Sequence, residues 1–278
     1  MRIIASETVT QAVRQLCMEA NYNLPDDVRR AISSAQQAEP SPVGKEILEK
    51  LLENAEIAQQ KQVPICQDTG MAVFFVEIGS QVHVEGENLT AAINRGVREG
   101  YTAGYLRKSI VSDPIFRENT GDNTPAVIHY DFCDGDQLAI TIAPKGFGSE
   151  NMSALRMFSP SDGIEAVKAF VIDTVDRAGS NPCPPIVVGV GLGGNFESCA
   201  MLAKKALTRS TPNPSRYYAG LEQELLDSIN QLGIGPQGFG GRTTALHVYI
   251  ETAPTHIAGL PAAVNISCHV TRHRTKIL

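Results

Sequence analysis

The sequence predicts a mixed α/β (α+β) fold, in which mixed β-sheets are flanked by helices. Apolar residues recur at three- and four-residue spacing through the first part of the chain, which is typical of amphipathic helices. Farther along, short runs rich in Val, Ile and Phe alternate with helical segments and glycine-rich loops. Because no linker divides the chain, we expect one domain over residues 1–278, with a helical part at about 1–62 and a mixed-sheet core at 63–278.

The N-terminal helices are expected from start signals that are followed by apolar periodicity. Segment 6–20 places Val9, Val13 and Leu16 on one stripe. Pro25 and the two acidic residues after it open a second helix, because proline and negative charge suit a helix N-terminus. Further helices are expected at 42–61, 88–105, 161–178, 196–208 and 215–231.

Strands are expected where β-branched and aromatic residues cluster between turn signals. These segments are 72–78, 126–132, 137–143, 186–190, 243–251 and 262–270. In the last of them the side chains alternate between two faces, so Cys268 is expected to point to the apolar side with Ile266, and His269 to the opposite side.

Composition and charge narrow the choice of partners and compartment. The net charge of −6 is spread along the chain without a basic block, so we expect no nucleic-acid partner, because phosphate binding requires clustered Lys and Arg. No apolar run reaches the ~18 residues of a membrane span. The first residues lack the apolar core of a signal peptide. We therefore expect a cytoplasmic protein that does not bind membranes.

Six cysteines in a chain of this length do not indicate a disulfide scaffold. Cys17, Cys133 and Cys199 have no chemically active neighbours in the sequence and are expected to pack in the interior. The other three lie in unusual settings. Cys66 precedes an amide and a carboxylate, Cys183 lies among three prolines, and Cys268 precedes a histidine.

The residues by themselves leave three interpretations of these last cysteines open. They could be buried thiols that only fill space. They could hold an iron–sulfur cluster, and three thiolates would leave one iron free to act as a Lewis acid. A zinc site is the third interpretation, with ligands from His256, Cys268, His269 and His273. It is the least favoured, because Cys268 and His269 are neighbours expected to face opposite ways.

Glycine-rich segments suggest two further kinds of site. Segment 189–194 matches GxGxxG, the dinucleotide fingerprint, but the helix after it is not followed by a second strand. Close helix–strand packing, or a helix N-terminus for a small anion, is therefore the favoured interpretation. The loops 145–149 and 235–241, with Arg107 and the turn 119–124, offer N–H groups and a cation. Together they favour a small carboxylic acid as the ligand.

Six ordered blocks carry a resemblance over nearly the full chain. They are CQDTG at 66–70, NTGDNTPAVIH at 119–129, APKGFGSENMSAL at 143–155, NPCPPIVVGVG at 181–191, GIGPQGFGGRTTAL at 233–246 and PTHIAGLPAAVNISCH at 254–269. The chain resembles the alpha subunit of class I, iron–sulfur-dependent fumarate hydratase. The related alpha subunit of L-tartrate dehydratase shares several of these blocks.

The resemblance implies a cofactor and a set of site residues. It implies a [4Fe–4S] cluster held by Cys66, Cys183 and Cys268, with an open iron that binds the substrate. The positions that match substrate-binding residues of the family are Gln67, Asp68, Arg107, Gly148 and His256. Of these, Asp68 matches the general acid, and Asp68 and His256 are the two expected catalytic residues.

The resemblance also implies a partner. In single-chain members of the family a second domain supplies a threonine base and further cationic groups, so a beta subunit is expected to supply them here, in an α2β2 heterotetramer. The expected reaction is the reversible hydration of fumarate to (S)-malate. Dehydration of L-tartrate to oxaloacetate is the alternative, and a non-catalytic metal-binding subunit is a further one.

Overall fold

The computed structural model describes all 278 residues and confirms the mixed α/β class, with helices beside two four-stranded sheets of mixed direction. The chain forms two compact units. The first unit contains Met1–Pro25, Asn54–Phe147 and Arg272–Leu278, and the second contains Asp26–Glu53 and Gly148–Thr271. The expected helical part, 1–62, therefore contributes to both units.

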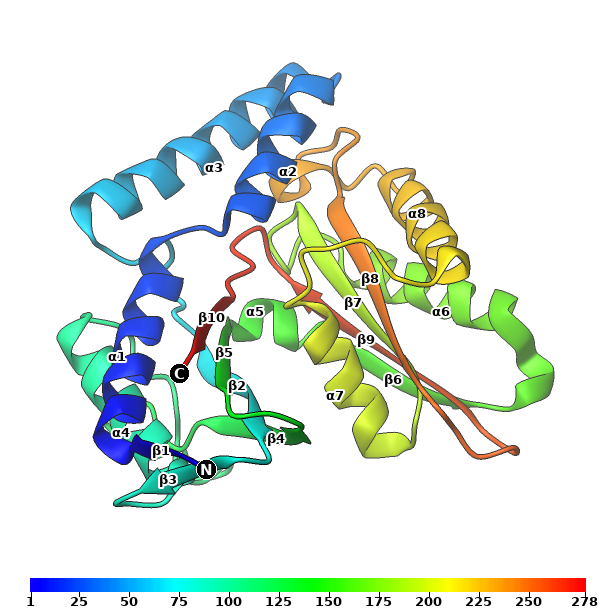
Figure 1. The fold of residues 1–278 in the computed structure, drawn as a ribbon. Helices are drawn as coiled ribbons and strands as arrows, with labels where there is room; N and C mark the ends of the chain where they lie inside the picture. The colour runs from blue at the N-terminus through cyan, green and yellow to red at the C-terminus, as the bar shows by residue number, and fades with distance from the viewer. The chain divides into compact units, whose positions relative to one another are not determined.

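The first unit is built on a sheet with the strand order β10-β5-β2-β4 (Figure 1). β2 pairs in parallel with β4 and antiparallel with β5, which in turn pairs antiparallel with β10. Strands β1 and β3 form a separate two-stranded parallel sheet. Its elements are β1 (Arg2–Ala5), α1 (Ser6–Tyr22), β2 (Met71–Gly79), β3 (Val82–Glu85), α4 (Leu89–Ala103), β4 (Val127–Cys133), β5 (Leu138–Lys145) and β10 (Arg274–Ile277).

The core of the first unit lies between helices α1 and α4 and the sheet. Fully buried apolar side chains come from both helices, among them Val9, Val13 and Val97, and from the sheet, among them Phe74 and Ile140. The stripe expected for the first helix is therefore its buried face, and the predicted bounds of 6–20 and 88–105 differ from the observed ones by at most two residues.

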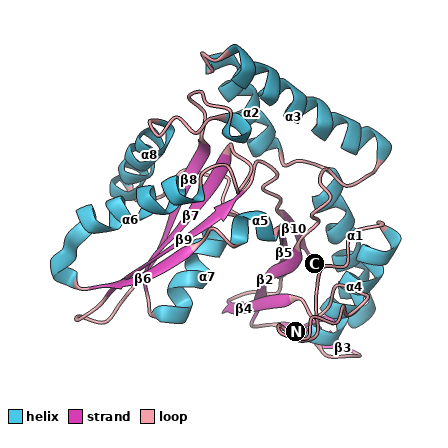
Figure 2. Cartoon of the chain, turned by 180° about the vertical axis from the view of Figure 1, so that it is seen from behind, coloured by secondary structure: helices cyan, strands magenta, loops and turns pink.

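The second unit is built on a sheet with the order β6-β9-β7-β8, in which β7 pairs in parallel with β8 and antiparallel with β9. Helix α7 covers one face, and α6 and α8 cover the other (Figures 1 and 2). The elements are α2 (Asp26–Ala38), β6 (Ala154–Phe158), α6 (Gly163–Ala178), β7 (Ile186–Gly193), α7 (Phe196–Ala206), α8 (Arg216–Asn230), β8 (Ala245–Ala253) and β9 (Leu260–Ser267). Two helices run across the division between the units: α3 (Pro42–Lys61) and α5 (Phe147–Glu150).

The GxGxxG segment lies within strand β7 except for its last residue, Gly194. Gly189, Gly191 and Gly193 lie within β7, so they form no phosphate-binding loop after it. A Cβ atom on Gly191 would come within 2.0 Å of the Cys199 carbonyl oxygen, and one on Gly189 within 2.1 Å of the Ala203 carbonyl oxygen. Close packing of helix α7 on β7 is therefore the reason for these glycines, as the favoured interpretation predicted.

Replacing Gly191 by alanine is expected to lower the free energy of unfolding by about 3 kcal/mol or more, because the new methyl group overlaps a backbone oxygen that cannot move without shifting α7. Urea titration measures the effect. The matched control is Gly220→Ala in α8, where nothing lies within 4 Å of the new Cβ atom. That variant is expected to gain roughly 0.5–1 kcal/mol. Equal stability of the two variants would contradict the packing argument.

Two expectations about cysteines were wrong. Strand β9 ends at Ser267, so Cys268 lies beyond the strand and is half-buried, not directed into an apolar face. The physical reason lies in the partner strand: the β9 pairing stops at Val187–Ser267, where β7 has a register shift, and the N–H of the next residue, Ile186, donates to the Thr244 carbonyl oxygen. Cys133 is exposed, because it ends the edge strand β4.

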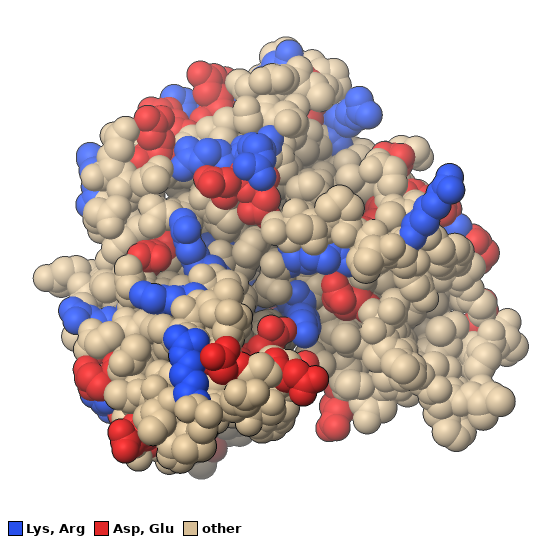
Figure 3. All heavy atoms as spheres, viewed as in Figure 1, with Lys and Arg blue, Asp and Glu red and all other residues tan.

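Charged side chains of both signs are interspersed over the face shown in Figure 3. None of the helices is both long enough and apolar enough to cross a membrane.

Candidate functional site

The loop with Cys66 connects α3 to β2 in the first unit. Both backbone groups of Ile65, at the start of the loop, are hydrogen-bonded. The Ile65 N–H donates to the Asn21 carbonyl oxygen at 3.0 Å, and Asn54 Nδ2 donates to the Ile65 carbonyl oxygen at 2.9 Å. Cys66 is half-buried, and its Sγ lies 3.2 Å from Gln67 Oε1, so the thiol donates to the amide. The Cys66 thiol and the Gln67 amide therefore lie together at the loop surface.

The Asp68 carboxylate is oriented by two backbone donors. Oδ1 accepts from the Gly70 N–H at 3.1 Å, and Oδ2 accepts from the Phe147 N–H at 2.9 Å. A Cβ atom on residue 146 would lie 3.0 Å from Oδ2, so glycine at that position leaves room for the carboxylate. The result is a half-buried acid group held in one direction, which suits it to bind a substrate or to transfer a proton.

A buried arginine lies beneath this loop. Arg272 is only 3% exposed, and it donates from Nη2 to the Asp68 carbonyl oxygen at 2.9 Å and from Nη1 to Asn21 Oδ1 at 2.7 Å. Arg272 was not among the residues predicted from the sequence. No local pattern could have found it, because 204 positions separate it from Asp68.

Arg107 is attached to the same loop through Thr69. The Arg107 N–H donates to Thr69 Oγ1 at 2.9 Å, and the hydroxyl donates back to the Arg107 carbonyl oxygen at 3.3 Å. Tyr101 supports the loop from the interior by donating to the carbonyl oxygens of Thr69 and Gly70. The first unit thus holds the loop of Cys66, Gln67 and Asp68 next to the backbone of the exposed Arg107 through hydrogen bonds to Thr69.

The turn at 119–124 is a structural support and not a surface turn alone. Asn123 is fully buried with φ 63°, and its amide donates to the Gly70 carbonyl oxygen at 3.2 Å. Its Oδ1 accepts from the Ser109 N–H at 2.7 Å. The turn therefore ties the segment after Arg107 to the Asp68 loop. The neighbouring Asp122 holds the turn closed through Thr124 and Arg98.

The stability of this turn is expected to depend on pH through Asp122. Burial acts to raise the pKa of this carboxyl, but hydrogen bonds from Arg98 and Thr124 outweigh it and lower the pKa to about 2. A carboxyl whose pKa is lower in the folded state stabilises the fold above its unfolded value of roughly 3.9, and this contribution is lost as pH falls toward 2. Asp122→Asn should therefore cost up to about 2 kcal/mol at pH 6 and about half of that at pH 3, by urea unfolding. An equal cost at both pH values would contradict this assignment.

In the second unit, Cys183 lies in an exposed turn before β7. It has φ 55°, a left-handed conformation that is rare for a residue with a side chain, and prolines flank it on both sides. His269, the neighbour of Cys268, lies against it, with Nδ1 3.0 Å from the Cys183 carbonyl oxygen. The segments of Cys183 and Cys268 therefore meet at one end of the sheet. Gly148 is near them, because a Cβ atom on it would lie 3.9 Å from the Asn181 carbonyl oxygen.

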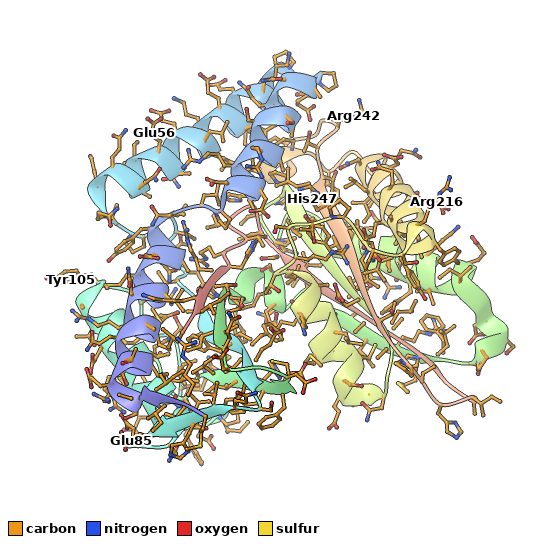
Figure 4. The ribbon with its side chains drawn as sticks, viewed as in Figure 1. Glu56, Glu85, Tyr105, Arg216, Arg242 and His247 are labelled. Atoms are coloured by element: carbon orange, nitrogen blue, oxygen red, sulfur yellow. The ribbon has the colours of Figure 1, made fainter.

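The glycine-rich loop 233–241 also reaches this end of the sheet. Gln237 donates from Nε2 to the Pro184 carbonyl oxygen at 2.7 Å. The buried carboxylate of Glu39 accepts from the N–H groups of Arg242, which is labelled in Figure 4, and of Thr243. Burial acts to raise the pKa of Glu39, but these backbone hydrogen bonds outweigh it and lower the pKa. The loop therefore contacts the Cys183 turn through Gln237 and is itself held by hydrogen bonds to Glu39.

His256 lies elsewhere. It is exposed in the turn between β8 and β9, and its Nδ1 accepts from the Ala258 N–H at 3.2 Å. Strand β9 separates it from Cys268, and a strand of this length spans roughly 23 Å. Figure 1 shows the turn and the end of β9 at opposite ends of the sheet. The structure does not bring His256 to the cysteines of its own unit.

The six thiols fall into distinct chemical groups, and none is in a disulfide. Cys17 and Cys199 are fully buried, and burial raises the pKa of both, to about 11 for Cys199. Metal ligands must be thiolates, so these two are poorly suited. Cys66, Cys183 and Cys268 lie in loops, exposed or half-buried, and fit the donor set of an iron–sulfur cluster.

The three cysteines predicted as cluster ligands belong to different units. No group of three or more His, Cys, Asp and Glu side chains forms a metal-binding arrangement. Cys66 belongs to the first unit, whereas Cys183 and Cys268 belong to the second. Of the residues considered as zinc ligands, His256 lies at the opposite end of β9 from Cys268, so these two are not brought together within their unit.

Comparison with known proteins gives consistent matches. The model of the fumarate hydratase (Fumerase) family matches residues 10–276. A protein from Methanocaldococcus jannaschii named putative L(+)-tartrate dehydratase subunit alpha is 43% identical over 276 residues, which cover 96% of each chain. L(+)-tartrate dehydratase subunit alpha of Escherichia coli strain UTI89 is 34% identical, covering 98% of this chain and 91% of its own. The K12 protein of the same name is 33% identical, covering 99% and 92%.

Proposed function

Because the chain belongs to the fumarate hydratase (Fumerase) family, we propose that it is the alpha subunit of a two-subunit hydro-lyase that acts on a four-carbon dicarboxylate. The observation that carries this proposal is the grouping of Cys66, Gln67, Asp68 and Arg107 on one supported loop system. This loop carries a thiol and an oriented acid, and the segment bonded to it through Thr69 carries an exposed cation, which are groups that can serve the dehydration of a hydroxy acid.

The reversible hydration of fumarate to (S)-malate is the first candidate reaction, and the family description supports it. Dehydration of L-tartrate to oxaloacetate is the second, and the names of the relatives support it. The two hydroxy acids differ by one hydroxyl group, so the same cation, amide and acid can serve either. Discrimination between them depends on whether the site contains a hydrogen-bond partner for the second hydroxyl.

We propose a [4Fe–4S] cluster as the cofactor, held by Cys66, Cys183 and Cys268. These three cysteines lie outside the apolar interior, in contrast to Cys17 and Cys199. When bound, such a cluster supplies a Lewis-acidic iron that stabilises a departing hydroxyl group.

The chain's own residues would bind the substrate and move the proton. Arg107 would bind one carboxylate bidentately, because a guanidinium matches the geometry of that group. Gln67 and the backbone N–H of Gly148 would orient the substrate by further hydrogen bonds. Asp68, held by Gly70 and Phe147, would deliver the proton to the departing oxygen as the general acid.

His256 is proposed as a further substrate contact. Because β9 separates it from Cys268 by roughly 23 Å, one copy of the chain cannot present both to one small substrate. The proposed α2β2 assembly would supply His256 from a second copy. Mixing inactive His256→Ala and Cys66→Ser chains with the partner tests this idea, since shared sites should restore part of the activity; no recovery would count against it.

The partner would be a beta subunit, since the relatives are named as alpha subunits. It would supply the base that removes the proton from carbon. We place the enzyme in the cytoplasm, because thiolate ligands persist in a reducing compartment. Activity should be lost in air, since an iron without a protein ligand is open to oxidation.

The test is turnover after anaerobic reconstitution with iron and sulfide, with the partner and without it. Comparing kcat/KM for (S)-malate and L-tartrate, with D-tartrate as a control, identifies the substrate. We expect activity only when both subunits are present. A reconstituted complex that binds iron but converts neither hydroxy acid would refute the enzymatic proposal and would favour a non-catalytic metal-binding subunit.

A further inference from the structure

The turn that carries Cys183 is held from two sides. Its two successive carbonyl oxygens each receive a side-chain donor from a different loop: His269 Nδ1 lies 3.0 Å from the Cys183 oxygen, and Gln237 Nε2 lies 2.7 Å from the Pro184 oxygen. The Gln237 N–H adds a bond to the same Pro184 oxygen at 2.8 Å, and the Cys183 N–H donates to the Ser180 oxygen at 3.0 Å. The turn is therefore fixed on both sides of the residue that bears the thiol.

The contact with His269 defines which nitrogen of the ring carries hydrogen. A carbonyl oxygen can only accept, so Nδ1 must be the donor to Cys183. Gln237 Nε2 lies 3.3 Å from the same Nδ1, but two donors cannot bond to one another, so its hydrogen bond goes to Pro184. The two side chains thus hold neighbouring carbonyl groups without competing for either.

The backbone conformation of Cys183 explains why these hydrogen bonds are needed. The left-handed conformation of Cys183 is energetically unfavourable for a residue with a side chain. Such a conformation persists only where surrounding contacts enforce it. The flanking prolines restrict the turn but provide no N–H donors to hold it. The hydrogen bond from His269 acts on the carbonyl group of Cys183 itself.

We propose that His269 is a positioning residue that sets the spacing between the thiols of Cys183 and Cys268. It follows Cys268 directly in the chain, and its side chain adds a 3.0 Å contact to the 3.5 Å hydrogen bond that its backbone N–H donates to the same Cys183 carbonyl oxygen. This inference rests on the proposed function only in assigning the two thiols a ligand role. It gives His269 a use that needs no contact with metal or substrate.

The test measures the thiol pair without iron. In a Cys66→Ser background, the apo chain is titrated with phenylarsine oxide, which binds two neighbouring thiols together. His269→Ala removes the donor, whereas His269→Asn keeps an N–H donor at the position of Nδ1. His83→Ala, an exposed residue of β3, is the control. Thermal unfolding shows that each variant is folded.

We expect paired binding in the parent chain and in the His83 and His269→Asn variants. His269→Ala should weaken the binding roughly fivefold, as for the loss of one hydrogen bond. Equal affinity of the His269→Ala and His269→Asn variants would overturn the proposal, and so would a parent chain that does not bind the arsenical as a pair. In the full chain with Cys66 restored, iron and sulfide content after reconstitution should follow the same order.

The two readouts separate this inference from the proposed function. If the parent chain takes up no iron but the arsenical series shows the expected order, the cluster proposal fails and the role of His269 stands. If iron is bound equally by His269→Ala and His269→Asn and the arsenical affinities are equal, the cluster stands and the role of His269 fails. Gln237→Ala, which removes the donor to Pro184, provides a second folded variant with a weaker expected effect.

Discussion

Replacing Cys183 with serine is expected to abolish iron binding by the reconstituted enzyme and to lower kcat by about three orders of magnitude or more. A Lewis-acidic metal contributes several kcal/mol of transition-state stabilisation, and each 1.4 kcal/mol corresponds to about a factor of ten in rate. A serine hydroxyl is a poor iron ligand at neutral pH. The measurement is iron and sulfide content together with the turnover of malate and tartrate by the complex of both subunits.

The matched control for this variant is Cys133→Ser. Cys133 is exposed like Cys183, so it reports any general effect of removing a surface thiol, but it ends the edge strand β4 in the other unit. We expect it to retain iron and activity. Serine variants of Cys66 and Cys268 should behave as Cys183→Ser does. Full iron content in any one of these three variants would show that the cysteine in question is not a ligand.

The second large effect is expected for Asp68→Asn, with kcat lowered roughly 10²- to 10⁴-fold, the usual contribution of a general acid. An asparagine keeps the size of the side chain but has no acidic proton to deliver. It also loses one of the two present hydrogen bonds, because the oxygens of Asp68 accept one N–H each and an asparagine replaces one of them with a nitrogen that cannot accept. Turnover is to be measured at saturating substrate, where the effect on the chemical step is separated from binding.

Iron content must accompany this measurement, because Asp68 lies two residues from Cys66. The expected Asp68→Asn enzyme binds iron normally and fails in turnover. Asp131→Asn, at an exposed position of β4, is the control for the loss of one carboxylate and should remain active. An Asp68→Asn enzyme with full iron content and full turnover would show that the general acid is a different residue.

The helices were predictable because their signals are local. The stripe of Val9, Val13 and Leu16 needs only neighbouring residues to be recognised, and it is the buried face of α1. The longer strands were found for the same reason. Strands β1, β3, β6 and β10 were missed, because each has only four or five residues. These short strands form because they pair with residues far away in the chain, as Arg2 pairs with Val82.

The candidate site, too, was predictable only where its residues are neighbours in the chain. The loop Cys66–Gly70 was recognisable because unusual residue types are adjacent in the chain. Its supports were not, since Arg272 and Asn123 reach it from 204 and 53 positions away. At Cys268 the alternation of apolar and polar residues predicted a strand that the structure does not have. The strand ends at Ser267, the last residue that pairs with β7.

The sequence by itself therefore determined which reactive residue types are present and which are neighbours, such as the thiol of Cys66 and the acid two residues after it. Tertiary structure decided which of them meet. It placed His269 on the Cys183 turn and His256 at the far end of β9. The physical reason is that hydrogen bonds and steric contact act over a few ångströms in space, whereas the positions they join can lie anywhere along the chain.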